Sequence, residues 1–190
     1  MRKIMFSDKH CLTQAVLDGT KTMTRRVLRD NVPLGNWEET EKHLPYKVGE
    51  VIAIAQPYKD IIERLPMYSD AILDEVGMPR KEFKAGWTNK MFVKADLLPH
   101  HIRITDVKVE RLQSLSDDEV LREGIYPQRF FNKVEYVFAT KGKMNNTPVH
   151  RLKTFPTPRE AFAALIDKIS GKGTWENNPW VVAYSFELVD

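Results

Sequence analysis

A stretch of ten residues near the N-terminus holds the side chains best suited to chemistry. From Leu17 to Arg26, it combines a glycine with cations and hydroxyl groups. These residues are Gly19, Thr20, Lys21, Thr22, Thr24, Arg25 and Arg26. A glycine that turns the chain, followed by cations and hydroxyls at the start of a strand, can form a cradle for an anion or another polar ligand. The alternative is that the lysine and the arginines are solubilising charges at a strand edge.

Local signals predict the elements that would position this cradle. Residues 13–18 are expected to form a short helix, with Thr13 as its N-cap and Gly19 as its left-handed C-terminal cap. The β-branched residues between Thr20 and Val27 then predict a strand. Alternation along this strand would give it two distinct faces. One face would carry Lys21, Met23 and Arg25, and the other Thr22, Thr24 and Arg26.

Length and composition set the broad class of protein. With 190 residues, 42% of them hydrophobic and 29% charged, the chain suits a single globular domain with insertions. No apolar run approaches the roughly 18 residues of a membrane span, so no membrane partner is expected. The net charge of +3 permits nucleic-acid binding but does not argue for it.

The cysteine and histidine content bears on location and metal binding. Cys11 is the one cysteine, so no internal disulfide can form, and no signal-peptide pattern is visible at the N-terminus. Both features predict a cytoplasmic protein. One cysteine and five scattered histidines give no zinc-finger spacing, so we expect neither a metal nor a cofactor.

The rest of the chain predicts strands separated by short helices and irregular loops. Strands are expected at Val51–Ala55, at His101–Leu112 with a bulge near Thr105, and at Trp180–Val189. Helices are expected at Ser116–Gly124, which has a capping box, and from Thr157 to Gly171. Residues 28–44 are expected to be a loop, and residues 128–155 a basic insertion or loop that could contain one hairpin. This pattern favours an α+β fold with a small mixed β-barrel.

Taken together, several of these segments resemble the ASCH domain family, a branch of the PUA-like β-barrel superfamily. Gly19–Arg26 matches the G-x-K-x-x-x-x-R pattern of that family. Further matches follow in the same order at Tyr46–Val51, at Ile104–Leu112 with the helix after it, and at Asn178–Val181. The last of these is similar to the ending of phage- and prophage-type members. The resemblance covers most of the chain and leaves out two insertions, near residues 58–85 and 128–155.

The resemblance implies both a fold and a function. The fold would be a small PUA-like mixed β-barrel with short flanking helices, formed by one domain over residues 1–190. Relatives bind RNA or modified nucleosides, and some compact members are amidohydrolases that remove the acetyl group from N4-acetylcytidine. Carried over to this chain, the catalytic residues would be Lys21, Thr24 and Glu123. Arg26, Arg25 and Trp87 would contact the substrate.

Amide hydrolysis needs an activated nucleophile, an acid for the leaving nitrogen and stabilisation of the oxyanion. The resemblance makes Thr24 the nucleophile, Lys21 its general base and Glu123 the general acid. Burial or a nearby cation such as Arg25 would lower the pKa of Lys21 and suit it to this role. One conflict is internal to the hypothesis, because strict alternation puts Lys21 and Thr24 on opposite faces of the strand.

Each of these residues also has a simpler interpretation. Glu123 could be a solvated carboxylate at a helix end, or form a salt bridge with Lys21 or Arg26. Trp87 could wall a base-stacking pocket or belong to the core. For Lys21 and Glu123 a geometric test exists, because acid–base partners must reach the same substrate. A separation above about 10 Å would exclude a shared pocket.

Three functions follow from these readings. The first is an enzyme, an amidohydrolase or a nuclease by the family resemblance. The second is an RNA-binding module without catalytic activity. The third is an interaction protein of phage origin that keeps the binding cleft of the family without using it.

Overall fold

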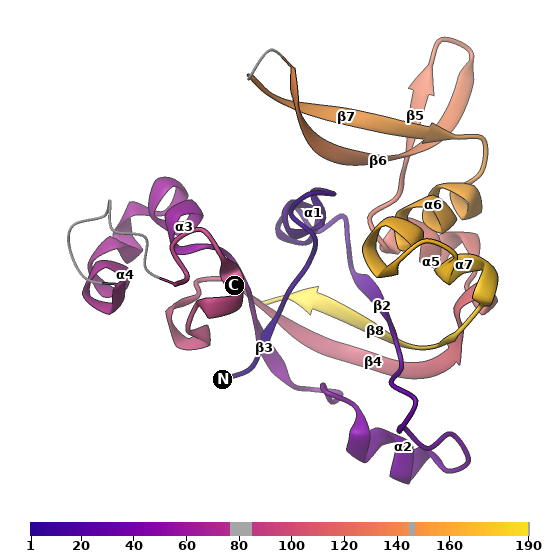
Figure 1. Ribbon diagram of the computed structural model, residues 1–190, viewed down its shortest axis with the longest axis horizontal. Helices are drawn as coiled ribbons and strands as arrows, with labels where there is room; N and C mark the ends of the chain where they lie inside the picture. The colour runs from indigo at the N-terminus through magenta and orange to yellow at the C-terminus, as the bar shows by residue number, and fades with distance from the viewer. Residues whose placement is uncertain (77–84, 145–146, 190) are drawn as a thin grey trace. The chain divides into compact units, whose positions relative to one another are not determined.

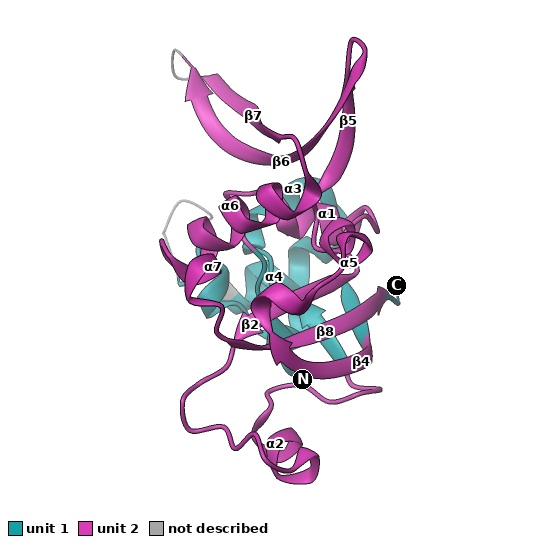
Figure 2. Ribbon diagram, turned by 90° about the vertical axis from the view of Figure 1, so that its right-hand side faces the viewer, with its two compact units in different colours: residues 1–6, 51–103, 188–190 teal, residues 7–50, 104–187 magenta. Residues whose placement is uncertain are grey.

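A computed structural model describes residues 1–76, 85–144 and 147–189 of the chain. The chain divides into two compact units, which Figure 2 colours separately. Unit 1 contains residues 1–6, 51–103 and 188–190, and unit 2 contains residues 7–50 and 104–187. The three residues expected to be catalytic all belong to unit 2. The single domain over residues 1–190 stays a prediction.

Unit 1 is built on β3 (Val51–Ile54), an apolar strand that the sequence predicted. β1 (Lys3–Ile4) pairs with β3 in parallel, and the first residues of β4 (His101–Arg111) pair with it antiparallel. The chain after β3 forms helices whose apolar residues Tyr58, Ile61 and Ile72 are fully buried. The helical elements are α3 (Tyr58–Arg64), η1 (Pro66–Tyr68), α4 (Ser69–Val76), η2 (Lys90–Phe92) and η3 (Ala95–Leu97).

Unit 2 contains the strand that carries the motif residues. β2 (Met23–Val27) pairs antiparallel with β8 (Trp180–Leu188), and β8 lies between β2 and β4. Residues Val181–Phe186 of β8 are buried one after another, because both faces of this strand are covered.

The helices of unit 2 are α1 (Leu12–Leu17), α2 (Trp37–His43), η4 (Leu112–Ser114), α5 (Asp117–Arg122), α6 (Pro158–Ser170) and α7 (Thr174–Asn177). α1, α5 and α6 lie on the same side of β2 and β8, and α2 lies apart from them (Figure 1).

The basic segment forms a second, antiparallel sheet in unit 2, ordered β5 (Tyr126–Phe130), β6 (Lys133–Met144) and β7 (Thr147–Phe155). Its apolar residues Val137 and Phe138 are fully buried, and Phe138 stacks on Phe155. Beyond them most side chains are exposed. The segment was expected to be a basic insertion or loop that could contain one hairpin, and the loop alternative was wrong, because its three strands pair as two hairpins. Backbone pairing holds these strands without an apolar period for the sequence to reveal.

The described residues confirm an α+β fold with two sheets. Neither sheet closes into a barrel within the described ranges, so the small PUA-like β-barrel stays a prediction. The helix at Ser116, the long helix after Thr157 and the strand at His101 were predicted correctly. The buried residues of β4 change phase between Ile104 and Val107, as the expected bulge requires.

Three local predictions need correction. α1 begins at Leu12 after Cys11, whose backbone is left-handed with φ of 57°, so Thr13 is not its N-cap. β2 begins at Met23, because the N–H groups of Thr20 and Lys21 both donate to the carbonyl of Ala15 in the turn after α1. α2 lies in a segment expected to be a loop, where Asn36 caps the helix by accepting from the N–H of Glu38.

Candidate functional site

The Lys21 ammonium group lies inside unit 2, with 2% of its side chain exposed. Its Nζ lies 2.7 Å from the carbonyl oxygen of Met23, 2.7 Å from that of Glu123 and 2.8 Å from Oε2 of Glu123. An ammonium group has three N–H donors, and each has an acceptor here. Lys21 and Glu123 are thus direct partners although 102 residues separate them in sequence. The separation that would exclude a shared site is not found.

Arg25 joins the same carboxylate from the strand. Its Nη1 lies 3.1 Å from Oε1 of Glu123, so both oxygens of Glu123 accept hydrogen bonds from cations. Its Nε and Nη2 donate to Oε1 of Glu110 at 3.0 and 2.7 Å, and Nη2 also donates to Oε2 of Glu119 at 2.9 Å. The guanidinium side chain is fully buried. A planar donor fork of this kind can hold several carboxylates at once.

Lys108 extends the cluster toward the surface. It forms ion pairs with Glu119 and Glu110, and 36% of its side chain is exposed. Burial raises the pKa of Glu119, but the hydrogen bonds from Lys108 and the backbone of Ser116 and the charge of Arg25 outweigh it and leave this pKa below its ordinary value. Three cations and three carboxylates therefore form one balanced network, which we call the ion cluster. Its members are Lys21, Arg25, Lys108, Glu110, Glu119 and Glu123.

Two elements bring Glu123 to Lys21. A capping box of Ser116 and Glu119 fixes the start of α5, and Glu123 is its C-cap. The end of α5 is tied to the segment before β2, because the N–H of Thr22 donates to the carbonyl of Arg122 at 3.0 Å and Nε of Arg122 donates to Oγ1 of Thr22 at 3.1 Å. These two bonds set the carboxylate of Glu123 beside the Lys21 side chain.

Gly124 closes the turn after α5 against Lys21. Its φ of +95° suits glycine, and a Cβ there would lie 3.0 Å from Cδ2 of Leu12 and 3.6 Å from Cδ of Lys21. The sequence marked this glycine as a helix end. The structure adds that its missing side chain leaves room for Leu12 beside this turn.

The protonation of Lys21 reflects opposing influences. Burial lowers the pKa of the Lys21 ammonium below its ordinary value of 10.5, and the charges of Arg26 and Arg25 act in the same direction. The carboxylate of Glu123 raises the pKa again. Burial outweighs the ion pair with Glu123, so the pKa of Lys21 is lowered overall. The direction matches the one expected for a general base.

Thr24 and Arg26 point to the other face of the sheet. Thr24 lies opposite Tyr184 in the register of β2 and β8, and residues that pair across strands share a face. The guanidinium group of Arg26 lies 5.9 Å from the centre of the Tyr46 ring, which packs edge-on against Tyr184. The structure therefore brings together Lys21, Arg25 and Glu123 and places Thr24 and Arg26 across the strand from them.

Trp87 belongs to unit 1. It is partly buried and packs against the apolar cluster around Tyr58, Ile61 and Ile72. This is the placement of a core residue, the simpler of its two interpretations.

Glu110, Glu119 and Lys108 were not among the predicted site residues. Glu119 is the glutamate of the predicted capping box, and its carboxylate also accepts hydrogen bonds from Arg25 and Lys108. A weak signal existed, because alternation along β4 would put Lys108 and Glu110 on one face. Only the packing of α5 beside β2 shows that Glu110 and Glu119 both accept hydrogen bonds from Arg25.

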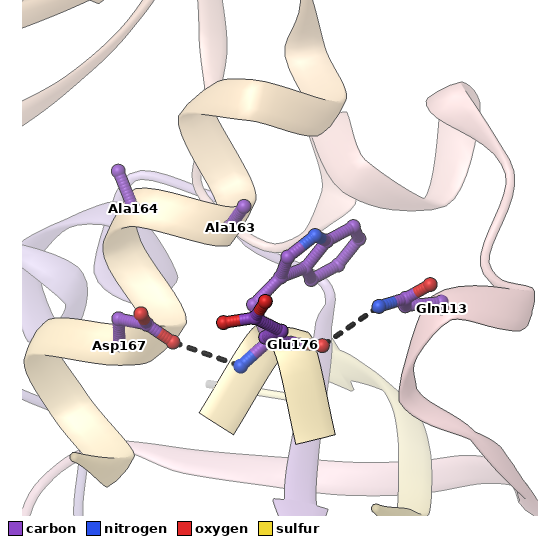
Figure 3. A pocket seen from close by; sticks show the side chains of 6 residues that line it. Gln113, Ala163, Ala164, Asp167 and Glu176 are labelled. Carbon is purple, nitrogen blue, oxygen red and sulfur yellow. Dashed lines mark hydrogen bonds between the residues drawn. The ribbon is translucent and has the colours of Figure 1, made fainter. Parts of the chain in front are cut away.

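A separate hollow of about 440 Å³ lies between α6 and α7, lined by Gln113, Ala163, Ala164, Asp167, Trp175 and Glu176 (Figure 3). None of the predicted site residues lines it. Its polar groups hold α7 in place, since Asp167 accepts from the N–H groups of Gly173 and Trp175 and Gln113 donates to the carbonyl of Trp175. The hydrogen bonds from Trp175 and Gly173 lower the pKa of Asp167. This hollow has a structural explanation that needs no ligand.

Within the described ranges, no three or more histidine, cysteine, aspartate or glutamate side chains are grouped to hold a metal ion. None of the described helices has the length and apolar character needed to cross a membrane. No family model, no curated protein and no solved structure matches the chain.

Proposed function

We propose that this chain is an ASCH-type, PUA-like protein that binds a modified nucleoside, free or within RNA, and hydrolyses an N4-acetylcytidine-like amide at the ion cluster. The resemblance of Gly19–Arg26 to the family motif selects Lys21, and the resemblance of the Ser116 helix selects Glu123. The observation that carries the proposal is the contact of these two side chains at 2.8 Å in a buried site.

The burial of the cluster favours a function over an incidental salt bridge. Moving charges out of water costs several kcal/mol per ion, and apolar replacements of a buried pair are often as stable or more so. Lys21, Arg25 and Glu123 are all almost fully buried. Buried ionisable groups with a shifted pKa, such as Lys21, cluster at functional sites, because catalysis needs them. A salt bridge with a purely structural role would cost less desolvation free energy at the protein surface.

The reaction would break the bond between the acetyl carbonyl carbon and N4 of the base, and addition of water would give cytidine and acetate. The Arg25 guanidinium is suited to stabilise negative charge on the carbonyl oxygen. Transfer of one proton from the Lys21 ammonium to Oε2 of Glu123, its partner at 2.8 Å, would leave a neutral amine and a protonated carboxyl group. The Lys21 amine, whose pKa is lowered, could then accept the proton of the nucleophile, and Glu123 could pass its proton to the leaving nitrogen, which restores the ion pair.

The role of Thr24 is the open element of the mechanism. The family resemblance makes it the nucleophile, whereas β2 turns its side chain away from the ion cluster. Thr24→Val keeps the shape of this side chain and removes its hydroxyl group. Loss of turnover in this variant would support Thr24 as nucleophile, and retained turnover would assign the attack to water.

The proposal is tested by incubating the full chain with N4-acetylcytidine and measuring cytidine and acetate release by chromatography. We expect turnover in the wild type, and a loss of about 100-fold or more in Lys21→Met and Glu123→Gln, since each removes a general acid or base. The Lys42–Glu39 pair has a similar contact, 2.7 Å, but is exposed. Lys42→Met and Glu39→Gln are therefore matched controls that should retain full activity.

Folding of each variant is checked by its thermal unfolding curve. If Lys21→Met does not fold, Lys21→Arg keeps the positive charge and removes the base. No turnover by the wild type, or equal turnover by the wild type and both site variants, would refute the proposal.

A further inference from the structure

The sheet formed by β5, β6 and β7, which we call the basic sheet, carries charge out of proportion to its size. Residues 126–155 contain six lysines and arginines and a single acidic residue, Glu135, a net charge of +5. The whole chain carries +3, so the remainder is slightly acidic. Positive charge is thus concentrated on this one sheet, which projects from the helices of unit 2 (Figures 1 and 2).

The cations of the basic sheet are exposed and ordered by the strand register. They are Arg129, Lys133, Lys141, Lys143, Arg151 and Lys153, all exposed to solvent. Alternation places Lys133, Lys141 and Lys143 of β6 on one face, and Lys141 lies opposite His150 of β7. Neighbouring cations on this face, such as Lys141 and Lys143, are about 7 Å apart along the strand. A row of cations at this spacing suits an extended polyanion.

The turn between β5 and β6 adds an exposed aromatic side chain. Phe131 is 99% exposed and has a left-handed backbone with φ of 51°. A phenylalanine is unfavourable in both respects, because its ring gains from burial and its Cβ disfavours positive φ. Phe130 beside it and Tyr126 in β5 are also partly exposed. Aromatic rings next to cations form the surface on which unpaired bases stack.

We infer that the basic sheet binds single-stranded RNA, with phosphates on the lysines of β6 and a base stacked on Phe131. The choice of RNA among polyanions rests on the proposed function. The inference that this surface binds a polyanion is independent of it, because it is drawn from the charge and the aromatic side chains of the sheet. Unpaired RNA is favoured over a duplex because the bases of a duplex are already stacked on one another. The sheet would hold the strand that carries the modified nucleoside.

Fluorescence anisotropy with a labelled single-stranded RNA of about 12 nucleotides tests the inference on the full chain. Lys141→Gln/Lys143→Gln should weaken binding about tenfold or more and reduce the salt dependence of log Kd by about 1.4, or about 0.7 per lost phosphate contact. Phe131→Ala should weaken binding about tenfold, with little change in salt dependence.

Matched controls remove equivalent groups elsewhere. Lys42→Gln/Lys59→Gln removes two exposed lysines outside the basic sheet, and Phe92→Ala removes an exposed phenylalanine of η2. Both should bind RNA like the wild type. Should the double lysine variant fail to fold, Lys143→Gln replaces it, with a loss of about 0.7 in the salt dependence. Equal RNA affinity in the sheet variants and the controls would overturn the inference, as would binding to phosphatidylserine vesicles without binding to RNA.

Turnover of free N4-acetylcytidine separates this inference from the proposed function. The sheet variants should hydrolyse the free nucleoside as the wild type does, because they leave the ion cluster intact. Sheet-dependent RNA binding without any turnover would leave the inference standing and refute the enzyme. Turnover without sheet-dependent RNA binding would refute this inference and leave the proposed enzymatic activity standing.

Discussion

At the scale of single residues, the ion cluster joins stability to the proposed chemistry. Lys21 and Arg25 hold both oxygens of Glu123, and Arg25 also holds Glu110 and Glu119. In such a network, removing one partner leaves an opposite charge buried and only partly compensated. The low polarity of this buried site makes the ion cluster unfavourable to form. It would also strengthen the electrostatic interaction of the cluster with charge that develops in a reaction.

Lys21→Met should therefore reduce the free energy of unfolding by about 3–5 kcal/mol, the usual effect of breaking a buried ion pair. Lys42→Met, which breaks an exposed pair, should cost no more than about 1 kcal/mol. Urea unfolding followed by circular dichroism measures both. Equal losses of unfolding free energy in the two variants would show that burial does not make the Lys21–Glu123 ion pair more important for stability than an exposed pair.

At the scale of elements, the site depends on how α5 meets the start of β2. The capping box fixes the first turn of α5, and the bonds between Arg122 and Thr22 fix its end. Gly124 then lets the chain turn without a side chain that would crowd Leu12. The junction, rather than either element alone, positions the carboxylate of Glu123.

Gly124→Ala tests this junction. The new Cβ would lie 3.0 Å from Leu12, and its backbone φ of +95° is strained for alanine. Gly49→Ala is the matched control, because Gly49 has a φ of +82° but no atom within 4 Å of a new Cβ. We expect both variants to lose about 1 kcal/mol from backbone strain, and Gly124→Ala to lose at least about 1 kcal/mol more from crowding. Thermal unfolding measures the difference, and equal melting temperatures would argue against close packing of the turn after α5 on Leu12.

At the scale of the molecule, stability and charge are unevenly distributed. The central residues of β8 are buried on both faces, whereas most side chains of β6 and β7 beyond Phe138 are exposed. Regions with few buried apolar contacts open more readily than the core. The two proposed activities follow this difference. Hydrolysis is proposed beside the buried strands β2 and β8, and RNA binding is proposed on the exposed basic sheet.

Hydrogen–deuterium exchange should show this gradient. Peptides from residues 149–153 of β7 should exchange much faster than peptides from Val181–Phe186, because the outer part of the basic sheet can open without exposing a core. Added single-stranded RNA should slow exchange in the basic sheet and leave the centre of β8 unchanged. Equal protection in β7 and β8 without RNA would contradict the uneven stability described above.

Much of the local structure could be predicted because it depends on neighbouring residues. The capping box of α5, the proline and threonine at the start of α6 and the apolar run of β3 are short-range signals, and each gave the correct element. The basic sheet was missed because its strands carry polar side chains on both faces. α2 was missed because its short polar helix has few apolar residues to reveal a period.

The residues alone indicated the α+β class and the positions of β3, β4, β8, α5 and α6. The sequence also suggested Glu123 as a partner through the family resemblance. Only the tertiary structure decided that Glu110 and Glu119 share Arg25 and that Thr24 faces away from the cluster. The physical reason is range: caps and alternation act within a few residues, whereas the contact of Lys21 with Glu123 crosses 102 positions and forms only when α5 packs beside β2.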